Sequence, residues 1–239
     1  MKIALLGYGK MGKVIEEIAI KRNHKIVLKI NSQNQDQLNI ENLKQVDIVI
    51  DFSSPYSAKS NILIAINSNT PVISGTTGWL ESYDEVTSIC INKNSAFLYA
   101  SNFSLGVNLF FELNKTLAGL MKDYNQYNVN MTEIHHTQKL DTPSGTAISL
   151  AEQIISENNN HNNWTLDKTN SNQSIFIDAQ RINMIPGTHI VNYKSDVDSI
   201  SIKHEAYSRK GFALGAVIAA EWIQNKKGVF SMRDVLFNS

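Results

Sequence analysis

The chain of 239 residues carries 22 lysines and arginines against 22 aspartates and glutamates, and it has one cysteine. It is long enough for one large or two modest domains with a substantial core. The balanced charge excludes the strongly basic surface typical of proteins that bind nucleic acid or an anionic membrane, so we expect neither partner. Cys90 cannot form an internal disulfide, and we expect a buried thiol. Without a signal-peptide pattern or an apolar run that could span a bilayer, the sequence indicates a cytoplasmic protein.

The first hundred residues alternate short apolar runs with helical patterns. Residues 2–6 are typical of a strand, which leads through a glycine-rich turn into apolar residues at helical spacing up to residue 22. Further strands are predicted at 25–30, 46–51, 71–74 and 96–99, with a helix at 58–66. This order predicts an α/β fold with a doubly wound parallel sheet that helices cover on both faces.

The pattern changes after residue 104. A long helix is predicted at 105–121 and a half-buried strand at 129–136, and the asparagine-rich segment 156–174 is expected to be a solvated loop. Strands at 175–179, 189–194 and 197–204 have no long helix between them, which favours an antiparallel arrangement. The apolar helix at 211–224 should be buried against the first domain. We therefore expect one domain over 1–106, completed by 212–239, and a smaller α+β domain over 107–211.

The segment "GYGKMG" lies between the first strand and the first helix. It places Gly7, Gly9 and Gly12 in the pattern G-x-G-x-x-G. In that context the first glycine permits a tight turn, the second lets a pyrophosphate approach the backbone, and the third allows close packing of helix and strand. The free amides and the dipole of the helix then favour the phosphates. The pattern predicts dinucleotide binding, with a merely structural turn as the alternative.

The residues after the second strand bear on the choice of cofactor. An acidic residue there would bond the ribose 2′-hydroxyl of NAD. The sequence instead reads "LKINSQN", with Asn31 and Ser32 at that position and Lys29 close by. Because no carboxylate would repel a 2′-phosphate, NADPH or the use of both cofactors is predicted. Ordinary loop residues are an equally good interpretation of Asn31 and Ser32.

Three more polar turns follow strands of the predicted sheet: "DFSSP" (51–55), "SGTTGW" (74–79) and "ASNFSLGVN" (100–108). In doubly wound sheets, ligands bind beyond the carboxyl ends of the strands. Gly75, Thr76 and Thr77 would offer amides and hydroxyls without bulk. Each turn alone could be structural, but together they are expected to border the cofactor.

The segment "EIHHTQKLDTPSGTA" (133–147) carries the chemistry of the second domain. Thr142 can cap a helix whose first residue is Pro143. The amides of Ser144, Gly145 and Thr146 would then be free at the helix N-terminus. With the hydroxyls of Ser144 and Thr146, these amides predict a site for a carboxylate or a phosphate.

Titratable residues precede that turn. His135, His136 and Lys139 can add positive charge and a transferable proton, and Asp141 could orient the lysine. The alternative is a half-exposed strand end with a capped helix. Zinc is not expected, because adjacent histidines project in opposite directions from a strand and no nearby residue completes a ligand set. A nucleotide domain followed by an anion site with an acid indicates hydride transfer to a small acidic substrate.

These motifs resemble the dihydrodipicolinate reductase family. Residues 133–147 match its signature E-x-H-H-x-x-K-x-D-x-P-S-G-T-A, and "GYGKMG", "DFSSP", "GTTG", "NFSLGVN", "HEAYSRKGFALGA" and "GVFSMRDVL" follow the order of the family along the whole chain. The resemblance implies a Rossmann-like domain, a substrate domain whose mixed sheet builds a homotetramer, and a C-terminal helix that returns to the first domain. It also implies NAD(P)H-dependent reduction of 4-hydroxy-2,3,4,5-tetrahydrodipicolinate, a small dicarboxylate, to tetrahydrodipicolinate in diaminopimelate and lysine biosynthesis.

The resemblance also implies roles for individual residues. His135 would donate the proton with the help of Lys139. The substrate carboxylates would be held by His136, Lys139, Ser144, Gly145 and Thr146. With the turns described above, the candidate cofactor residues are Gly7, Gly9, Lys10, Met11, Gly12, Asn31, Ser32, Phe52, Gly75, Thr76, Thr77, Ser101, Asn102 and Phe103. Arg181 and Arg209 are expected to be structural or domain-closing.

The sequence departs from the family pattern in two places. Asn31 replaces an acidic residue, and the sheet region between Pro186 and His204 is short, so the tetramer contacts are expected to differ. Two alternatives remain. One is another two-domain nicotinamide-dependent reductase, related to aspartate or homoserine dehydrogenase. The other is a nucleotide-sensing module without catalytic activity.

Overall fold

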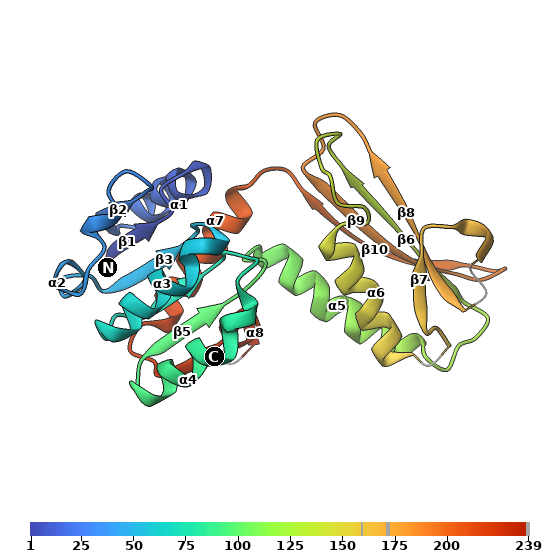
Figure 1. Ribbon diagram of the computed structural model, residues 1–239. Helices are drawn as coiled ribbons and strands as arrows, with labels where there is room; N and C mark the ends of the chain where they lie inside the picture. Colours follow the sequence, from blue (N-terminus) through green and yellow to red (C-terminus); the bar gives the residue numbers. More distant parts are fainter. Residues whose placement is uncertain (159, 171–172, 238–239) are drawn as a thin grey trace. The chain divides into compact units, whose positions relative to one another are not determined.

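The computed structural model describes residues 1–158, 160–170 and 173–237. The chain forms two compact units, one from Met1–Asn108 with Arg209–Ser239 and the other from Leu109–Ser208 (Figure 1). Residues 159, 171 and 172, which belong to the segment expected to be a solvated loop, lie outside the described residues. None of the helices within the described ranges is long and apolar enough to cross a membrane.

The first unit is built on a six-stranded sheet in which every pairing is parallel. The strand order is β11-β5-β4-β3-β1-β2. The strands are β1 (Lys2–Leu6), β2 (Lys25–Ile30), β3 (Ile48–Asp51), β4 (Val72–Ser74), β5 (Ala96–Tyr99) and β11 (Gly228–Phe230). The helices are α1 (Lys10–Lys21), α2 (Ile40–Leu43), α3 (Pro55–Asn67), α4 (Tyr83–Asn92), α7 (Lys210–Ile223) and α8 (Met232–Phe237), with short 3-10 turns at η1 (Gln35–Gln37) and η2 (Leu80–Ser82).

Two apolar clusters cover the two faces of this sheet. One joins the sheet to α1, α7 and α8, and the other joins it to α3 and α4. The four residues of β3, "IVID", are all buried, as a central parallel strand requires. Cys90 is fully buried in the second cluster, and burial raises the pKa of its thiol to about 11, so the expected buried thiol is confirmed. The predicted Rossmann-like, doubly wound fold is confirmed.

The C-terminal segment, Arg209–Ser239, belongs to the first unit. Along α7 the residues facing the sheet are small or β-branched, and Arg22 and His24 bind Glu221 of this helix at 2.7 Å each. The prediction missed β11, which adds the outermost strand beside β5. Three residues, "GVF", are too short to give a periodic signal.

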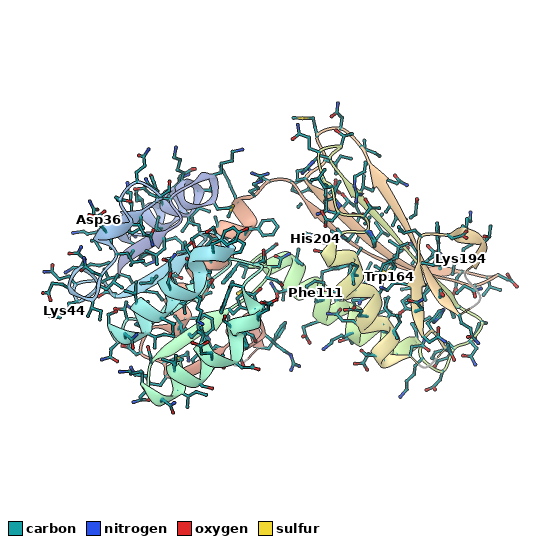
Figure 2. All side chains as sticks on the ribbon, viewed as in Figure 1. Asp36, Lys44, Phe111, Trp164, Lys194 and His204 are labelled. Atoms are coloured by element: carbon teal, nitrogen blue, oxygen red, sulfur yellow. The ribbon has the colours of Figure 1, made fainter. Side chains whose placement is uncertain are left out.

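The second unit is a five-stranded mixed sheet with two helices, α5 (Leu105–Met121) and α6 (Gly145–Glu157). The strands are β6 (Asn128–His135), β7 (Asn163–Thr165), β8 (Ser174–Arg181), β9 (Gly187–Lys194) and β10 (Ser199–Ala206), in the order β10-β9-β6-β8-β7, with a 3-10 turn η3 (Lys168–Asn170). Trp164 and Phe111 are among the partly buried side chains that pack against the core of this unit (Figure 2).

Two expectations for this unit need correction. β8 pairs with β6 in parallel, because α6 carries the chain back before β8 begins, so only β9 and β10 follow the antiparallel expectation. The segment expected to be wholly a loop contains β7, which pairs with β8. Its apolar Trp164 is partly buried against the core, which explains why this asparagine-rich segment can hold a strand.

Residues along β6 alternate between a buried and a half-buried face. Val129 and Met131 contribute to the apolar core with α5 and α6, and Glu133 and His135 continue the same buried face. Two buried polar side chains at the end of an apolar face make this end of β6 a candidate functional site.

Candidate active site

The glycine turn of the first unit depends on glycine for steric reasons. Gly7 has φ +84°, and a Cβ added there would lie 2.1 Å from the carbonyl oxygen of Phe52. A Cβ at Gly12 would lie 2.9 Å from the carbonyl oxygen of Gly7, whereas a Cβ at Gly9 would meet nothing within 4 Å. The first and third glycines therefore allow close packing, and the second borders open space.

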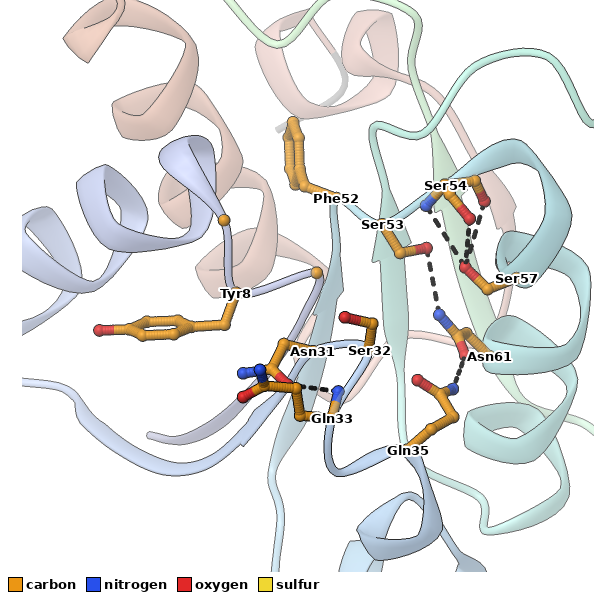
Figure 3. A pocket seen from close by; sticks show the side chains of 12 residues that line it. Tyr8, Asn31, Ser32, Gln33, Gln35, Phe52, Ser53, Ser54, Ser57 and Asn61 are labelled. Atoms are coloured by element: carbon orange, nitrogen blue, oxygen red, sulfur yellow. Dashed lines mark hydrogen bonds between the residues drawn. The ribbon is translucent and has the colours of Figure 1, made fainter.

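The N-terminus of α1 opens beside this space. Gly9 is the N-cap, and no side chain among the described residues caps the helix. The adjoining cavity has a volume of about 740 Å³ (Figure 3). It is lined by Gly7, Tyr8, Gly9, Asn31, Ser32, Gln33, Gln35, Phe52, Ser53, Ser54, Ser57 and Asn61. Free amides, a positive helix end and a cavity of this size fit the phosphates and the ribose of a dinucleotide.

No charged residue is among those that line the cavity. Lys29, the cation expected nearby, pairs with Glu16 at 2.6 Å and lies 4.9 Å from the centre of the Tyr8 ring. The hydrogen bond between them raises the pKa of Lys29 and lowers that of Glu16, so both groups stay ionised. The charge of Lys29 is therefore largely neutralised. The oxygen of Asn31 accepts the Gln33 amide at 2.8 Å, which leaves its NH₂ group for a ligand.

A buried aspartate organises two of the polar turns. Both carboxylate oxygens of Asp51 accept hydrogen bonds, from Ser53 and Asn61 on one oxygen and from Ser74 and Thr76 on the other, over 2.7 to 3.1 Å. Sequence reasoning did not identify this role, although an aspartate at the end of a buried strand was a usable signal. The expectation for the hydroxyl of Thr76 is wrong, because that hydroxyl is turned inward to Asp51.

The structure places the remaining candidate cofactor residues outside this cavity. Lys10, Thr77 and Ser101 are exposed, and Met11, Gly75 and Asn102 are half-buried. Phe103 is buried in the core, 5.6 Å from Phe52 between ring centres. A Cβ at Gly75 would lie 2.4 Å from the Phe52 ring, so this turn also approaches its neighbours closely. Of the predicted set, Gly7, Gly9, Asn31, Ser32 and Phe52 come together in one cavity.

In the second unit, strand register brings a charged cluster together. His135 of β6 is paired with Arg181 of β8, and Glu133 of β6 is paired with His189 of β9. The rings of His135 and His189 are 5.1 Å apart in an edge-to-face arrangement. Glu133, His135 and His189 are buried. The sequence prediction named His135 but missed the functional placement of Glu133 and His189.

Helix α6 begins two residues later than predicted. Ser144 is its N-cap, and its hydroxyl accepts the Ala147 amide at 3.2 Å. Thr142 and Pro143 precede the helix and are joined by a cis peptide bond, which the sequence did not reveal. The Ser144 amide donates to Glu133 at 3.3 Å, so it is not available for an anion as expected. Within the described part of the chain, the amides of Gly145 and Thr146 have no acceptor.

Space and charge around these two amides suit an anion. A Cβ at Gly145 would meet nothing within 4 Å. Lys139 binds Asp141 through both carboxylate oxygens at 2.8 and 2.9 Å, as the sequence suggested, and this hydrogen bond lowers the pKa of Asp141. His136 is half-buried, and its Nδ1 has no hydrogen-bond partner among the described residues. A ligand could satisfy that nitrogen.

His189 contacts Ser144, the residue that caps α6. Its Nε2 lies 3.0 Å from the Ser144 hydroxyl. Burial, with a smaller contribution from the neighbouring His135, lowers the pKa of His189 to about 3, so it is neutral. Glu133, His135 and His189 bring ligand atoms within 4.8 Å of one another, but Glu133 already binds the guanidinium of Arg181. That positive charge disfavours a metal ion at the same carboxylate.

Together, a Rossmann-like unit with a glycine-rich turn at a helix N-terminus and a second unit with a buried histidine ahead of a helix N-terminus are the features of a nucleotide-dependent oxidoreductase. The family described as "Dihydrodipicolinate reductase, N-terminus" matches residues 1–103, and "Dihydrodipicolinate reductase, C-terminus" matches residues 106–236. The chain belongs to the dihydrodipicolinate reductase family.

Individual relatives agree with this assignment. The chain is 52% identical to 4-hydroxy-tetrahydrodipicolinate reductase of Christiangramia forsetii over 99% of its own length and 98% of that protein. It is 36% identical to the enzyme of the same name from Rickettsia bellii, over 96% and 92% of the two chains. A dipicolinate-bound dihydrodipicolinate reductase from Paenisporosarcina sp. TG-14 has the same fold, with a TM-score of 0.80 at 21% identity and 99% coverage of both chains.

Proposed function

We propose that the chain reduces 4-hydroxy-2,3,4,5-tetrahydrodipicolinate to tetrahydrodipicolinate with NADPH or NADH, in the biosynthesis of diaminopimelate and lysine. The relatives at 52% and 36% identity, which bear this activity in their names, support the substrate. One observation of the structure carries the chemistry. The buried His135, held by a carboxylate, lies on the strand that leads to a helix N-terminus with two unpaired amides.

The substrate is a dicarboxylate, and the second unit offers two kinds of partner for it. The amides of Gly145 and Thr146 and the Thr146 hydroxyl would bind one carboxylate at the positive end of α6. Lys139 would bind the other carboxylate in exchange for Asp141, whose side chain is 59% exposed and free to move into water. His136 would complete this contact. Ser144 acts differently from the expectation, since its hydroxyl caps the helix.

The reduction consumes one hydride and one proton and releases the substrate hydroxyl as water. The cofactor supplies the hydride when bound. His135 supplies the proton, because a protonated imidazole ring is an effective general acid. About a tenth of the His135 side chain is exposed, so the buried ring can still reach a bound molecule. Lys139 assists by its positive charge, which favours electron density that builds up on the substrate nitrogen.

The cofactor would be held mainly by backbone. Gly7, Gly9 and the first turn of α1 would bind the pyrophosphate, and Asn31 and Ser32 would bind the ribose. The other predicted residues, at 10–12, 75–77 and 101–103, lie outside that cavity and would contribute from adjoining turns, with Thr76 and the buried Phe103 acting through their backbone. Because the cavity has neither a carboxylate nor an unpaired cation among its lining residues, we infer that both NADPH and NADH serve.

A homotetramer is part of the same proposal. One face of the second sheet packs on α5 and α6 (Figure 1), and the opposite face presents half-buried residues that include Ile134, Phe176 and Ile190. Half-buried apolar side chains on a sheet face fit an interface with other copies. Light scattering coupled to size exclusion would measure the mass, and a monomer at micromolar concentration would refute the tetramer.

The decisive experiment for the activity is a coupled assay. Aspartate semialdehyde and pyruvate, condensed by the synthase that forms the substrate, are offered to the enzyme with NADPH or NADH. Oxidation of cofactor that depends on the synthase product is expected with both. No oxidation with either cofactor would refute the proposed function.

A further inference from the structure

We propose that Glu133 is a positioning residue for the reaction: it holds the proton of His135 on Nδ1, so that Nε2 is the nitrogen that delivers a proton to the substrate. The proposal rests on the proposed function for its role in catalysis. Its structural part concerns only the second unit and can be tested without substrate.

Among the described residues, both oxygens of the Glu133 carboxylate have hydrogen-bond partners. One oxygen contacts Nδ1 of His135, and the other accepts from Arg181 Nη1 at 2.8 Å and from the Ser144 amide at 3.3 Å. The side chain of Glu133 is 1% exposed, so water does not compete for it. A carboxylate buried in this way stays ionised only if it is paired and hydrogen-bonded, and this one is both.

The charge of Glu133 decides where the proton of His135 lies. Burial would raise the pKa of Glu133, but hydrogen bonds from His135 and Arg181 outweigh burial, and the pKa is lowered. An ionised carboxylate has no proton to donate, so the contact requires a proton on Nδ1. Neutral His135 must then carry its lone pair on Nε2, and the imidazolium must release the proton from Nε2.

The surroundings of Nε2 agree with this assignment. A Cβ on Gly187 would lie 2.9 Å from Nε2, so a side chain at this position would press on the reactive nitrogen. Because Gly187 has no positive φ, its backbone conformation does not require glycine. The close approach of His135 explains why this position has no side chain. The neighbouring His189 is neutral and does not add positive charge that would drive the proton off His135.

Arg181 links this proton donor to the anion site. Its Nη1 binds Glu133, and its Nη2 donates to the Asp141 carbonyl at 2.6 Å and to the Thr142 hydroxyl at 3.0 Å. Glu133 in turn accepts the Ser144 amide at the start of α6. The pair therefore joins His135, the segment that carries Lys139 and the helix N-terminus into one unit. Arg181 is a positioning residue through Glu133, which gives a cause for its expected structural role.

The first test is spectroscopic and needs no activity. Solid-state ¹⁵N NMR of protein labelled in its 6 histidines would report the protonated nitrogen of each ring, with His135 identified by the loss of its signals in His135→Gln. At a pH where His135 is neutral, we expect the proton on Nδ1. A proton on Nε2 in the wild type would overturn the proposal, whatever the substrate proves to be.

The second test is kinetic. Glu133→Gln should lower kcat by up to about 10⁴-fold with little change in KM, the loss found when a catalytic histidine loses its orienting carboxylate. The alkaline limb of the pH profile should move to lower pH, because the imidazolium loses its counter-charge. Glu41→Gln is the matched control because Glu41 is 78% exposed. This variant should leave kcat and the pH profile unchanged.

A kcat within twofold of the wild type together with an unmoved pH profile would contradict the role of Glu133. If Glu133→Gln does not fold, Arg181→Lys tests the same link, with a smaller loss of kcat expected because the single ammonium cannot bind Glu133 and the Asp141 carbonyl together. An unchanged kcat in folded Arg181→Lys would overturn the part of the proposal that concerns Arg181.

Discussion

The two candidate binding regions of this protein are built from different materials. The cavity of the first unit is lined by backbone and uncharged side chains, and Lys29, close to it in sequence, is paired with Glu16. The site of the second unit consists of charged and titratable side chains on β6, β8 and β9. A backbone site should be sensitive to added bulk, and a charged site should be sensitive to the loss of single functional groups. The predictions below follow from this difference.

The largest effect is expected at His135. His135→Gln removes the proton donor and should lower kcat roughly 10²- to 10⁴-fold, with a smaller change in KM. Steady-state kinetics in the coupled assay measure both. His161→Gln, in the same unit, is the control and should behave as the wild type. A change confined to KM would contradict the role assigned to His135.

At Gly7 the expected effect is on both fold and cofactor binding. Gly7→Ala places a Cβ 2.1 Å from backbone at φ +84°, so the turn must shift. We expect a loss of stability of about 1 to 3 kcal/mol, as for other strained backbone positions, and a cofactor Kd weakened at least tenfold. Thermal unfolding and fluorescence titration with NADPH measure the two effects.

Gly9→Ala is the matched comparison, because its Cβ meets no atom within 4 Å. It should keep the stability of the wild type and weaken only cofactor binding. If Gly7→Ala were as stable as Gly9→Ala, the steric interpretation of the turn would be wrong.

Thr146→Val tests the anion site with an isosteric change. The hydroxyl is lost while the amide remains, so we expect KM for the substrate to rise about 10- to 100-fold, the cost of one hydrogen bond to a charged group, with kcat nearly unchanged. Thr116→Val, at an exposed position of α5, is the control. An unchanged KM would remove the Thr146 hydroxyl from the site.

The buried His189 predicts a pH dependence of stability. Its pKa is lowered to about 3, so below about pH 6.5 the unfolded chain binds a proton at His189 that the folded chain does not bind. His189 therefore leaves the free energy of unfolding unchanged above that pH. As pH falls towards 3, it lowers this free energy by up to about 1.4 kcal/mol per pH unit. In urea unfolding at several pH values, His189→Gln should show a shallower loss over this window. A parallel loss in both proteins would contradict a neutral His189.

The smallest effect is expected at Glu16. Glu16→Gln frees the charge of Lys29 near the ribose end of the cavity, so kcat/KM with NADPH should rise a few-fold relative to NADH. The effect should shrink at high salt because both groups are partly exposed. Glu17→Gln, whose partner Lys21 lies on the same helix, should leave the ratio unchanged. A ratio unaffected by Glu16→Gln would mean that Lys29 does not reach the cofactor.

Sequence periodicity predicted most of the first unit because most residues of its strands are apolar and its longer helices follow a 3.6-residue repeat. It did not reveal the parallel pairing of β8, since a mixed sheet and an antiparallel sheet give the same alternation along one strand. For the candidate site, spacing alone pointed to His135, Lys139 and a helix N-terminus. Glu133 was visible only as part of a motif, and His189 had no local signal because strand pairing brings it to Glu133.

The start of α6 shows the same limit. Thr142 and Ser144 are both good N-cap residues, and only the three-dimensional structure shows that Ser144 has this role while Thr142 binds Arg181. The inward turn of Thr76 likewise depends on Asp51, which is distant in sequence. Local chemistry was therefore predictable, and contacts between distant strands were not.

The central claim is that the reaction takes its hydride from a nicotinamide cofactor and its proton from His135. Isotope transfer tests it most directly. The coupled reaction is run in ordinary water with NADPH that carries deuterium at the transferred position of the nicotinamide, and the mass of the product is measured by mass spectrometry. We expect one deuterium per molecule of tetrahydrodipicolinate. A product without deuterium, formed while the cofactor is oxidised, would contradict the account.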